Sequence, residues 1–317
     1  MVSISQAVQA AGVVGAGGAG FPTHIKLSQK AEWVVGNGAE CEPLLRVDQQ
    51  MARLYARKLI RGLEIAREAV GARRAGIALK HKYHDALHAV RQAAAGTTIE
   101  VYELQDFYPA GDEFNLVYEV TGRVIPEAGR PTDVGCLVQN VVTLLQIVDA
   151  VDSGQPVTAR PVTIGGAVAR PMTLEVPLGT PFTFCLDAAG GAIETDYVVI
   201  DGGPMMGKFV DPVTAAVSKR TSGFLVFPRA HPYVTRRTRT PDEFQAIALR
   251  PVQPLHRVLP AQPARPPLLA APGHARRSLG HADQRGRDHG LALLRVRHVL
   301  ALGLPHSAAG ARDHGRD

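Results

Sequence analysis

Four glycines stand within six residues near the N-terminus, at Gly15, Gly17, Gly18 and Gly20. Because glycine has no side chain, such a loop leaves backbone N–H groups open and can wrap closely around an anion. Lys26 follows a few residues later, where its ammonium could meet a phosphate as a point charge. The segment predicts a site for a nucleotide or flavin phosphate; the alternative is a glycine-rich surface loop without a ligand.

The same glycines spell G-x-G-x-x-G, which taken alone is a weak sign of a dinucleotide site. That fingerprint works only with a strand before the glycines and a helix after them. Residues Ile4–Ala11 instead predict a short helix, and Phe21 and Pro22 follow the loop. Proline lets a helix begin but not run through it. The sequence therefore disfavours an ordinary dinucleotide-binding turn.

A second polar cluster follows a short predicted strand over Glu32–Gly36 and contains Asn37, Glu40 and Glu42. The carboxyl end of a strand is where open α/β sheets bind their ligands. Carboxylates repel phosphate, but they accept hydrogen bonds from ribityl or ribose hydroxyls, a flavin N–H or a nicotinamide amide. A solvated acidic turn is the alternative interpretation.

Two further clusters complete a pattern. Tyr108–Glu113 reads Tyr-Pro-Ala-Gly-Asp-Glu, and Gly129–Gly135 leads into Val138–Leu144, which contains Asn140 and Thr143. In order and spacing, the four clusters resemble the flavin-binding 51 kDa subunit family of respiratory complex I. The resemblance is closer to two relatives, the RnfC subunit of the Rnf electron-transport complex and the cobalamin reductase of propanediol utilisation. It covers about the first 230 residues.

The resemblance implies FMN as cofactor and NADH as substrate, with the hydride and electron chemistry belonging to the flavin and no catalytic side chain. The residues that it implies for holding FMN and the nicotinamide are Gly15, Gly17, Gly18, Gly20, Phe21, Lys26, Asn37, Glu40, Glu42, Tyr108, Gly111, Asp112, Glu113, Asn140 and Thr143. Complex I subunits carry Arg at the position of Ala16, Asp at that of Ala39 and Glu at that of Asp112. These departures bear on NADH recognition more than on FMN binding.

Apolar periodicity predicts the elements that must position these clusters. Helices are expected over 47–70, 85–95 and 140–151, and strands over 32–36, 76–79 and 98–104. Their alternation favours a parallel α/β layer. After Gly154 the pattern changes to short strand-like runs over 160–166 and 172–177 and a strand pair over 217–227.

We therefore expect an α/β protein with a Rossmann-like FMN-binding domain over 1–153 and an irregular tail over 236–317. Between them, over 154–235, the resemblance implies a small β-grasp (ubiquitin-like, SLBB) domain. Asp201–Gly207 reads as a turn that the cobalamin-reductase branch shares; a bend without a ligand is equally compatible with it.

The chain from Leu249 onward has only ten residue types and contains no lysine, glutamate or aromatic residue. Eleven arginines stand there against four aspartates, so this segment accounts for the net charge of +6. A nucleic-acid surface would fit that charge. Because no aromatic side chain is present to stack on a base, we expect no nucleic-acid partner.

This composition is typical of GC-rich coding DNA translated in a shifted frame. One nucleotide downstream, the codons of Leu249, Val252, Leu255 and Leu259 permit cysteines with the C-x2-C-x2-C-x3-C spacing of a ferredoxin cluster. Val296–Pro305 permits a second such run, and the resembled family carries two 4Fe–4S clusters at this place. We hypothesise a frameshift between Arg236 and Leu249, which the genomic DNA sequence tests.

The cysteines of the chain as given are Cys41, Cys136 and Cys185, and none forms a C-x-x-C pair, so the sequence predicts no iron–sulfur or other metal ligands. Unpaired thiols without a signal peptide favour the cytoplasm, in a microcompartment or peripheral to a membrane complex. Charged residues within 291–304 argue against a transmembrane segment.

The leading functional hypothesis is an FMN-dependent NADH oxidoreductase or electron-transfer subunit that passes electrons to an iron–sulfur partner or to cobalamin. The alternative is a non-enzymatic flavin-binding or docking module of an electron-transport complex or microcompartment. The sequence leaves open the natural acceptor, the choice between NADH and NADPH, and the oligomeric state.

Overall fold

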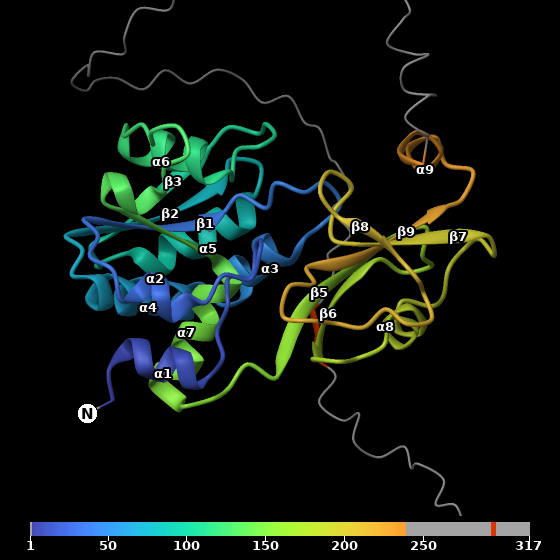
Figure 1. Ribbon diagram of the computed structural model, residues 1–317, viewed down its shortest axis with the longest axis horizontal. Helices are drawn as coiled ribbons and strands as arrows, with labels where there is room; N and C mark the ends of the chain where they lie inside the picture. The colour runs from blue at the N-terminus through green and yellow to red at the C-terminus, as the bar shows by residue number, and fades with distance from the viewer. Residues whose placement is uncertain (1, 239–292, 296–317) are drawn as a thin grey trace, which may run out of the picture. The chain divides into compact units, whose positions relative to one another are not determined.

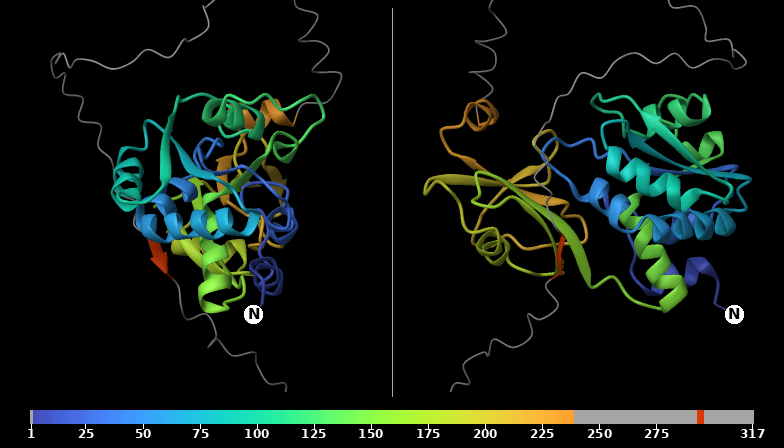
Figure 2. Two further views of the ribbon diagram at one scale, coloured as in Figure 1. Left: turned by 90° about the vertical axis from the view of Figure 1, so that its left-hand side faces the viewer. Right: turned by 180° about the vertical axis from the view of Figure 1, so that it is seen from behind.

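The computed structural model describes residues 2–238 and 293–295, and residues 2–228 build two sheets with their own helices (Figures 1 and 2). The elements up to residue 153 are α1 (Ile4–Ala10), α2 (Thr23–Leu27), β1 (Trp33–Gly38), α3 (Val47–Leu54), α4 (Ala56–Val70), β2 (Arg74–Lys80), α5 (His84–Ala94), β3 (Ile99–Leu104), α6 (Glu113–Thr121), a 3-10 turn (Pro131–Val134), β4 (Cys136–Asn140) and α7 (Val141–Ser153).

The first sheet has the strand order β3-β2-β1-β4, with all neighbours parallel. The chain moves outward from β1 to β2 and β3, then returns to place β4 on the other side of β1. The strand order therefore reverses at β1 and β4, whose carboxyl ends lie side by side. Open α/β sheets bind ligands in the crevice at such a switch point, so the carboxyl ends of β1 and β4 are where we look for a ligand site.

Helices cover both faces of this sheet, as expected for buried parallel strands. On one face, buried residues of α4, α5 and α7 such as Leu63, Val90 and Leu144 share a core with Val34 and Ile77. On the other, α6 packs onto β1 and β4 (Figure 1). The predicted parallel α/β layer is confirmed.

Two details of the first layer differ from the sequence prediction. The helix expected over 47–70 is two helices, α3 and α4, because Tyr55 between them has φ −122° and ψ 32°. The predicted helix before the glycines is α1, which Ser3 caps by accepting a hydrogen bond from the Gln6 backbone N–H. The glycine loop therefore joins two helices and is not a strand-to-helix turn.

The second sheet has the order β10-β6-β5-β9-β7-β8. Its elements are β5 (Ala159–Gly166), β6 (Met172–Pro177), α8 (Phe182–Ala188), β7 (Tyr197–Asp201), β8 (Lys208–Val210), β9 (Gly223–Pro228) and the short β10 (Leu293–Arg295). An antiparallel β5–β6 hairpin, α8 against the sheet and a central parallel β5–β9 pair form the β-grasp arrangement.

The prediction of a strand pair over 217–227 is wrong, because only β9 forms there. Residues 218–222 form a turn, and Lys219 in it contacts Gly12 of the first domain. Helix α9 (Pro232–Arg237) lies in the segment after Pro228, which is a unit separate from the two sheets. Apart from residues 236–238 and β10, the predicted irregular tail lies outside the described residues, and so do both ferredoxin-like runs. Within the described residues, no helix is long and apolar enough to cross a membrane.

Candidate functional site

At the carboxyl ends of β1 and β4, the sheet register places two amides side by side. Asn37 near the end of β1 is the register partner of Asn140 at the end of β4. Asn140 also caps α7, because its Oδ1 accepts the Val142 N–H at 2.8 Å. Two residues from separate sequence clusters thus meet at the switch point.

The glycine loop lies against these strand ends. The Ala16 N–H donates to Thr143 Oγ1 at 2.9 Å, which holds the loop on the first turn of α7. A Cβ at Gly17 would stand 2.8 Å from Asn140 Nδ2, so only glycine permits this approach. Within the described residues, no hydrogen bond of ordinary geometry is donated by the backbone N–H groups of residues 17–20.

This arrangement fits a phosphate and an aromatic ring system. The unbonded N–H groups of the loop are the donors that an anion-binding nest requires, and no heavy atom lies within 4 Å of the position that a Cβ would take at Gly18. Phe21 and Tyr108 are 44% and 43% exposed, so their rings are open to a ligand. Backbone donors, open space and exposed rings together fit the chemistry of FMN.

Lys26 lies at this end of the sheet but is engaged by protein groups. Its Nζ stands 3.1 Å from Glu113 Oε1 and donates to the Val138 carbonyl at 3.3 Å. The structure therefore places two predicted site residues, Lys26 and Glu113, in one ion pair. A direct contact of Lys26 with a phosphate stays a prediction.

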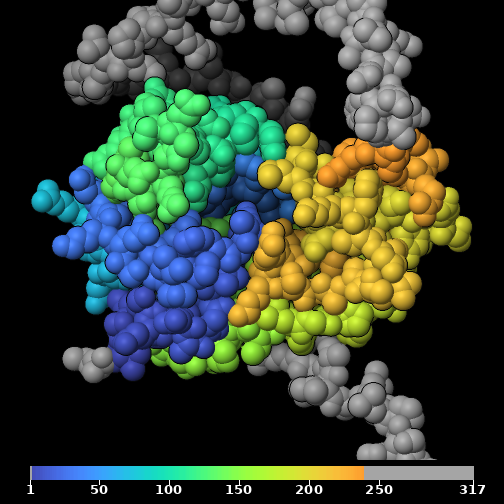
Figure 3. Space-filling view, viewed as in Figure 1, coloured from blue at the N-terminus to red at the C-terminus, as the bar shows by residue number. Residues whose placement is uncertain are grey.

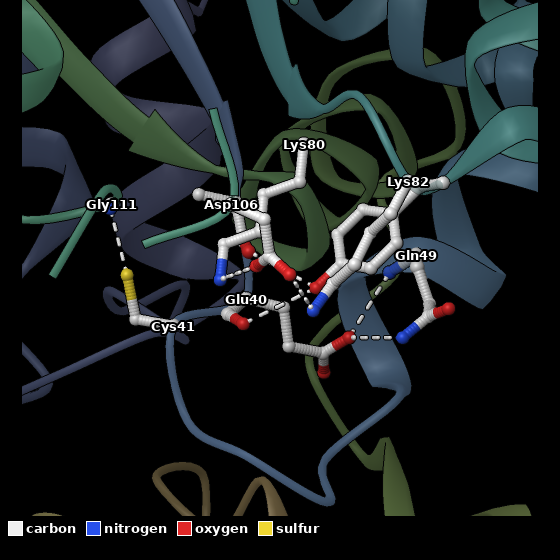
Figure 4. Close-up of polar contacts among 9 residues, drawn as sticks. Glu40, Cys41, Gln49, Lys80, Lys82, Asp106 and Gly111 are labelled. Atoms are coloured by element: carbon white, nitrogen blue, oxygen red, sulfur yellow. Dashed lines mark hydrogen bonds and ion pairs between the residues drawn. The ribbon is translucent and has the colours of Figure 1, made fainter. Parts of the chain in front are cut away.

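The third cluster is fastened to the second. Asn37 Nδ2 donates to the Gly111 carbonyl at 2.8 Å, and the Gly111 N–H donates to Cys41 Sγ at 2.7 Å (Figure 4). Burial raises the pKa of the Cys41 thiol, so it stays protonated near neutral pH. Asp112 caps α6 by accepting the Phe114 N–H. Gly111 therefore lies beside Asn37 near the carboxyl end of β1, and Asp112 follows it at the start of α6.

Glu40 is buried, and its carboxylate is occupied by the start of α3. Its Oε1 accepts the backbone N–H of Asp48 at 3.0 Å. Its Oε2 accepts the backbone N–H of Gln49 at 3.3 Å and the Gln49 side-chain amide at 3.4 Å (Figure 4). Burial, reinforced by the Asp48 charge, raises the pKa of Glu40 well above its usual range. The expected contact of Glu40 with a ligand stays a prediction.

Asp48 escaped the sequence prediction although it touches the site. Its Oδ2 accepts from Asn140 Nδ2 at 2.8 Å. Burial raises the pKa of Asp48, while the hydrogen bond from Asn140 and the charge of Arg160 oppose the rise. Asp48 thus fixes which way the Asn140 amide faces. In the sequence, Asp48 is one of several polar residues in an amphipathic helix, so no local pattern marks it as a site residue.

Glu42 connects the two domains. Its carboxylate oxygens accept the backbone N–H groups of Met205 and Met206 at 2.8 and 2.7 Å. Burial, together with the negative charge of Glu42, raises the pKa of Tyr108, which stays a hydrogen-bond donor. In the space-filling view the surface is hollowed between the green segment that carries α6 and the yellow residues that follow β7 (Figure 3). The 201–207 turn is therefore part of the site's surroundings.

Arg160, at the second position of β5, is a second functional residue that escaped prediction. It is 2% exposed, and its guanidinium donates to the Ala16 carbonyl at 2.6 Å and also to the carbonyls of Lys219 and Thr221. Burial lowers the pKa of Arg160 to about 10, so it is charged at neutral pH. The sequence feature that could have identified Arg160 is the presence of an arginine in an otherwise apolar strand.

The comparisons with known proteins agree with this geometry. Residues 8–149 match the model of the Nuo51 FMN-binding domain, and residues 161–209 match the SLBB domain. Over 235 residues the chain is 48% identical to cobalamin reductase PduS of Citrobacter freundii, covering 74% of this chain and 52% of that protein. It is also 39% identical, over 229 residues, to one component of the Na+-translocating ferredoxin:NAD+ oxidoreductase complex of Acetobacterium woodii, covering 70% of this chain and 52% of that protein.

A solved structure shows the same fold: an NAD+-reducing NiFe hydrogenase matches with a TM-score of 0.60 and 25% identity, over 72% of this chain and 47% of that one. The chain spans about half the length of the curated relatives it matches. Over the matched residues, the chain belongs to the family of the complex I 51 kDa flavin subunit and its RnfC and cobalamin-reductase relatives.

Proposed function

We propose that this chain binds FMN between its glycine loop and the β1–β4 crevice and acts as an NADH-oxidising electron-transfer subunit. The observation that carries the proposal is the set of unbonded N–H groups in residues 17–20, held over the in-register pair Asn37 and Asn140. Bound FMN would accept a hydride and release electrons one at a time. The matched FMN-binding domain supports this assignment.

The protein's own contribution is binding and orientation. The loop N–H groups offer hydrogen bonds to the phosphate, and the exposed rings of Phe21 and Tyr108 offer surfaces for an aromatic ligand. Asn37 and Asn140 keep fixed orientations through Gly111 and Asp48, which suits them to positioning a ligand's polar edge. No side chain in this set is required to form a covalent bond.

The electron acceptor is proposed from the relatives, one of which carries the name cobalamin reductase and another a role in a ferredoxin:NAD+ oxidoreductase complex. We propose an iron–sulfur partner or cobalamin as the acceptor. Among the described residues no group of three or more His, Cys, Asp or Glu side chains could hold a metal ion. The second candidate is the alternative that the sequence raised, a flavin-binding or docking module without turnover.

Anaerobic spectroscopy of the purified chain tests the proposal. The full chain, reconstituted with FMN, should retain flavin absorbance after gel filtration, and NADH should bleach that absorbance. Retained flavin that NADH does not reduce would favour the docking module. A chain that neither retains FMN nor gains thermal stability from it would refute flavin binding altogether.

A further inference from the structure

The glycine loop provides N–H donors but no side-chain cation of its own. Lys26, the nearest lysine in sequence, has its ammonium paired with Glu113. A doubly charged phosphate is held best where hydrogen-bond donors are accompanied by a positive side chain. A cation without a carboxylate partner would therefore complete the loop as a phosphate site.

The turn Lys219–Thr221 of the β-grasp domain packs against the glycine loop and its N-terminal neighbour. Lys219 Nζ donates to the Gly12 carbonyl at 2.6 Å. The buried guanidinium of Arg160 bonds the carbonyls of Lys219 and Thr221 together with that of Ala16. The residue between them, Arg220, is consequently held against the loop from both sides.

Arg220 crosses the loop at its last glycine. From the position that a Cβ would take at Gly20, Arg220 Cδ lies 3.0 Å, Cγ 3.1 Å and Nε 3.7 Å away. Gly20 also has φ +76°, a left-handed conformation that side chains disfavour. The glycine is therefore required both by the backbone and by the arginine that lies over it.

The guanidinium of Arg220 has no hydrogen-bonded or ion-paired partner within the described part of the chain. Its charge opposes the rise that burial causes in the pKa of Asp201, but the Asp201 carboxylate accepts its hydrogen bond from Thr221 Oγ1, at 3.3 Å. Arg220 is also exposed. An arginine held in place but unpaired is available to an anion.

We propose that Arg220, from the β-grasp domain, binds a phosphate group held by the glycine loop of the first domain. The inference rests on the proposed function because it names the charged partner of that same site. A planar guanidinium can donate two parallel hydrogen bonds to phosphate oxygens, which complements the single donors of a backbone nest. The phosphate belongs either to FMN or to the pyrophosphate of NADH.

Affinity measurements with ligands that differ by the phosphate test the assignment. We would titrate FMN, riboflavin and NADH separately into the full-length wild-type chain and the variant Arg220→Met, following intrinsic and flavin fluorescence. The matched control is Arg170→Met, since Arg170 lies in the same domain and also packs on a glycine of positive φ, Gly190. Arg220→Lys serves as the conservative variant.

If Arg220 binds the FMN phosphate, Arg220→Met weakens FMN binding about tenfold or more, as expected for a lost hydrogen bond to a charged group. Riboflavin affinity stays unchanged, Arg220→Lys recovers part of the loss, and Arg170→Met changes nothing. If the phosphate belongs to the dinucleotide, the same loss appears for NADH alone, which also supports the proposal.

Two results would overturn the inference. One is unchanged affinity of Arg220→Met for both FMN and NADH; the other is an equal loss for FMN and riboflavin, which indicates a general distortion of the site. A wild-type chain that binds neither FMN nor NADH would refute the proposed function itself, and is thereby distinguished from failure of the inference alone.

Discussion

Replacing Asn140 probes the link between the fold and the site, because one amide performs two tasks. Its oxygen accepts the Val142 N–H at the start of α7, and its nitrogen donates to Asp48. An N–H only donates and a carboxylate only accepts, so the two contacts fix the amide orientation. Asn140→Ala removes both interactions. Asn140→Ser removes only the second, because serine is a good N-cap but too short to reach Asp48.

The magnitudes follow from the two contacts. Loss of a helix N-cap costs about 1 kcal/mol. Loss of a hydrogen bond to a charged acceptor costs about 1.5–3 kcal/mol. Asn140→Ala should therefore lower the free energy of unfolding by about 2.5–4 kcal/mol, and Asn140→Ser by about 1 kcal/mol less. The difference between the two variants isolates the cap.

Urea denaturation at neutral pH, monitored by circular dichroism, measures both values. The double variant N140D/D48N provides the rescue, because aspartate caps helices well and the amide at position 48 can donate to it. The double variant should lose less free energy of unfolding than the two single substitutions lose in sum, by a coupling energy of about 0.5–3 kcal/mol. Equal stability of Asn140→Ala and Asn140→Ser, or no coupling in the double variant, would refute the assigned roles.

Two further predictions concern buried charges. Arg160→Met leaves the carbonyls of Ala16, Lys219 and Thr221 without their shared donor and should lower the free energy of unfolding by about 3–5 kcal/mol in urea denaturation. The exposed Arg170→Met control should lose less than about 0.5 kcal/mol. Similar losses for both variants would contradict the role of Arg160 in joining these carbonyls. Burial, together with the Asp48 charge, raises the pKa of Glu40 from 4.5 to about 8, so the folded state binds the proton more tightly than the unfolded chain. The stability of wild type relative to Glu40→Gln should therefore fall as the pH rises from 4.5 to about 8. A relative stability that rises over this window in pH-dependent denaturation would exclude a buried, protonated Glu40.

Much of the fold was predictable because its signals are local. Continuous apolar runs such as Trp33–Val35 and amphipathic stretches such as 56–70 reveal buried strands and covering helices from sequence alone. The break at Tyr55 was not predictable, because α3 and α4 continue one apolar pattern and the backbone departs from helical geometry at a single residue. The turn at 218–222 is polar, but it stands between Val217 and the apolar run of β9, so the prediction extended a strand pair across it.

The site was predictable to the extent that its residues come in clusters. Asn37, Gly111, Asn140 and the glycine loop do meet at the switch point, as strand-end polar groups and glycines indicated. Their partners were not predictable, because a partner is defined by contact across the fold. Asp48 stands 92 residues from Asn140 in sequence, and no local pattern distinguishes it from other helix residues.

For the same reason, the sequence alone does not reveal which charged side chains face the glycine loop. Lys26 stands next to the glycines in sequence, yet Glu113, 87 residues away, engages its ammonium. Arg160 and Arg220 belong to another domain, yet one holds the loop carbonyl of Ala16 and the other crosses Gly20. Since a buried arginine is costly unless its donors are satisfied, the three carbonyl partners of Arg160 favour only the arrangement in which the 219–221 turn meets the loop. That turn leaves Arg220 against Gly20, the last glycine of the loop. The β-grasp domain therefore contributes to the proposed phosphate site through the geometry that Arg160 enforces.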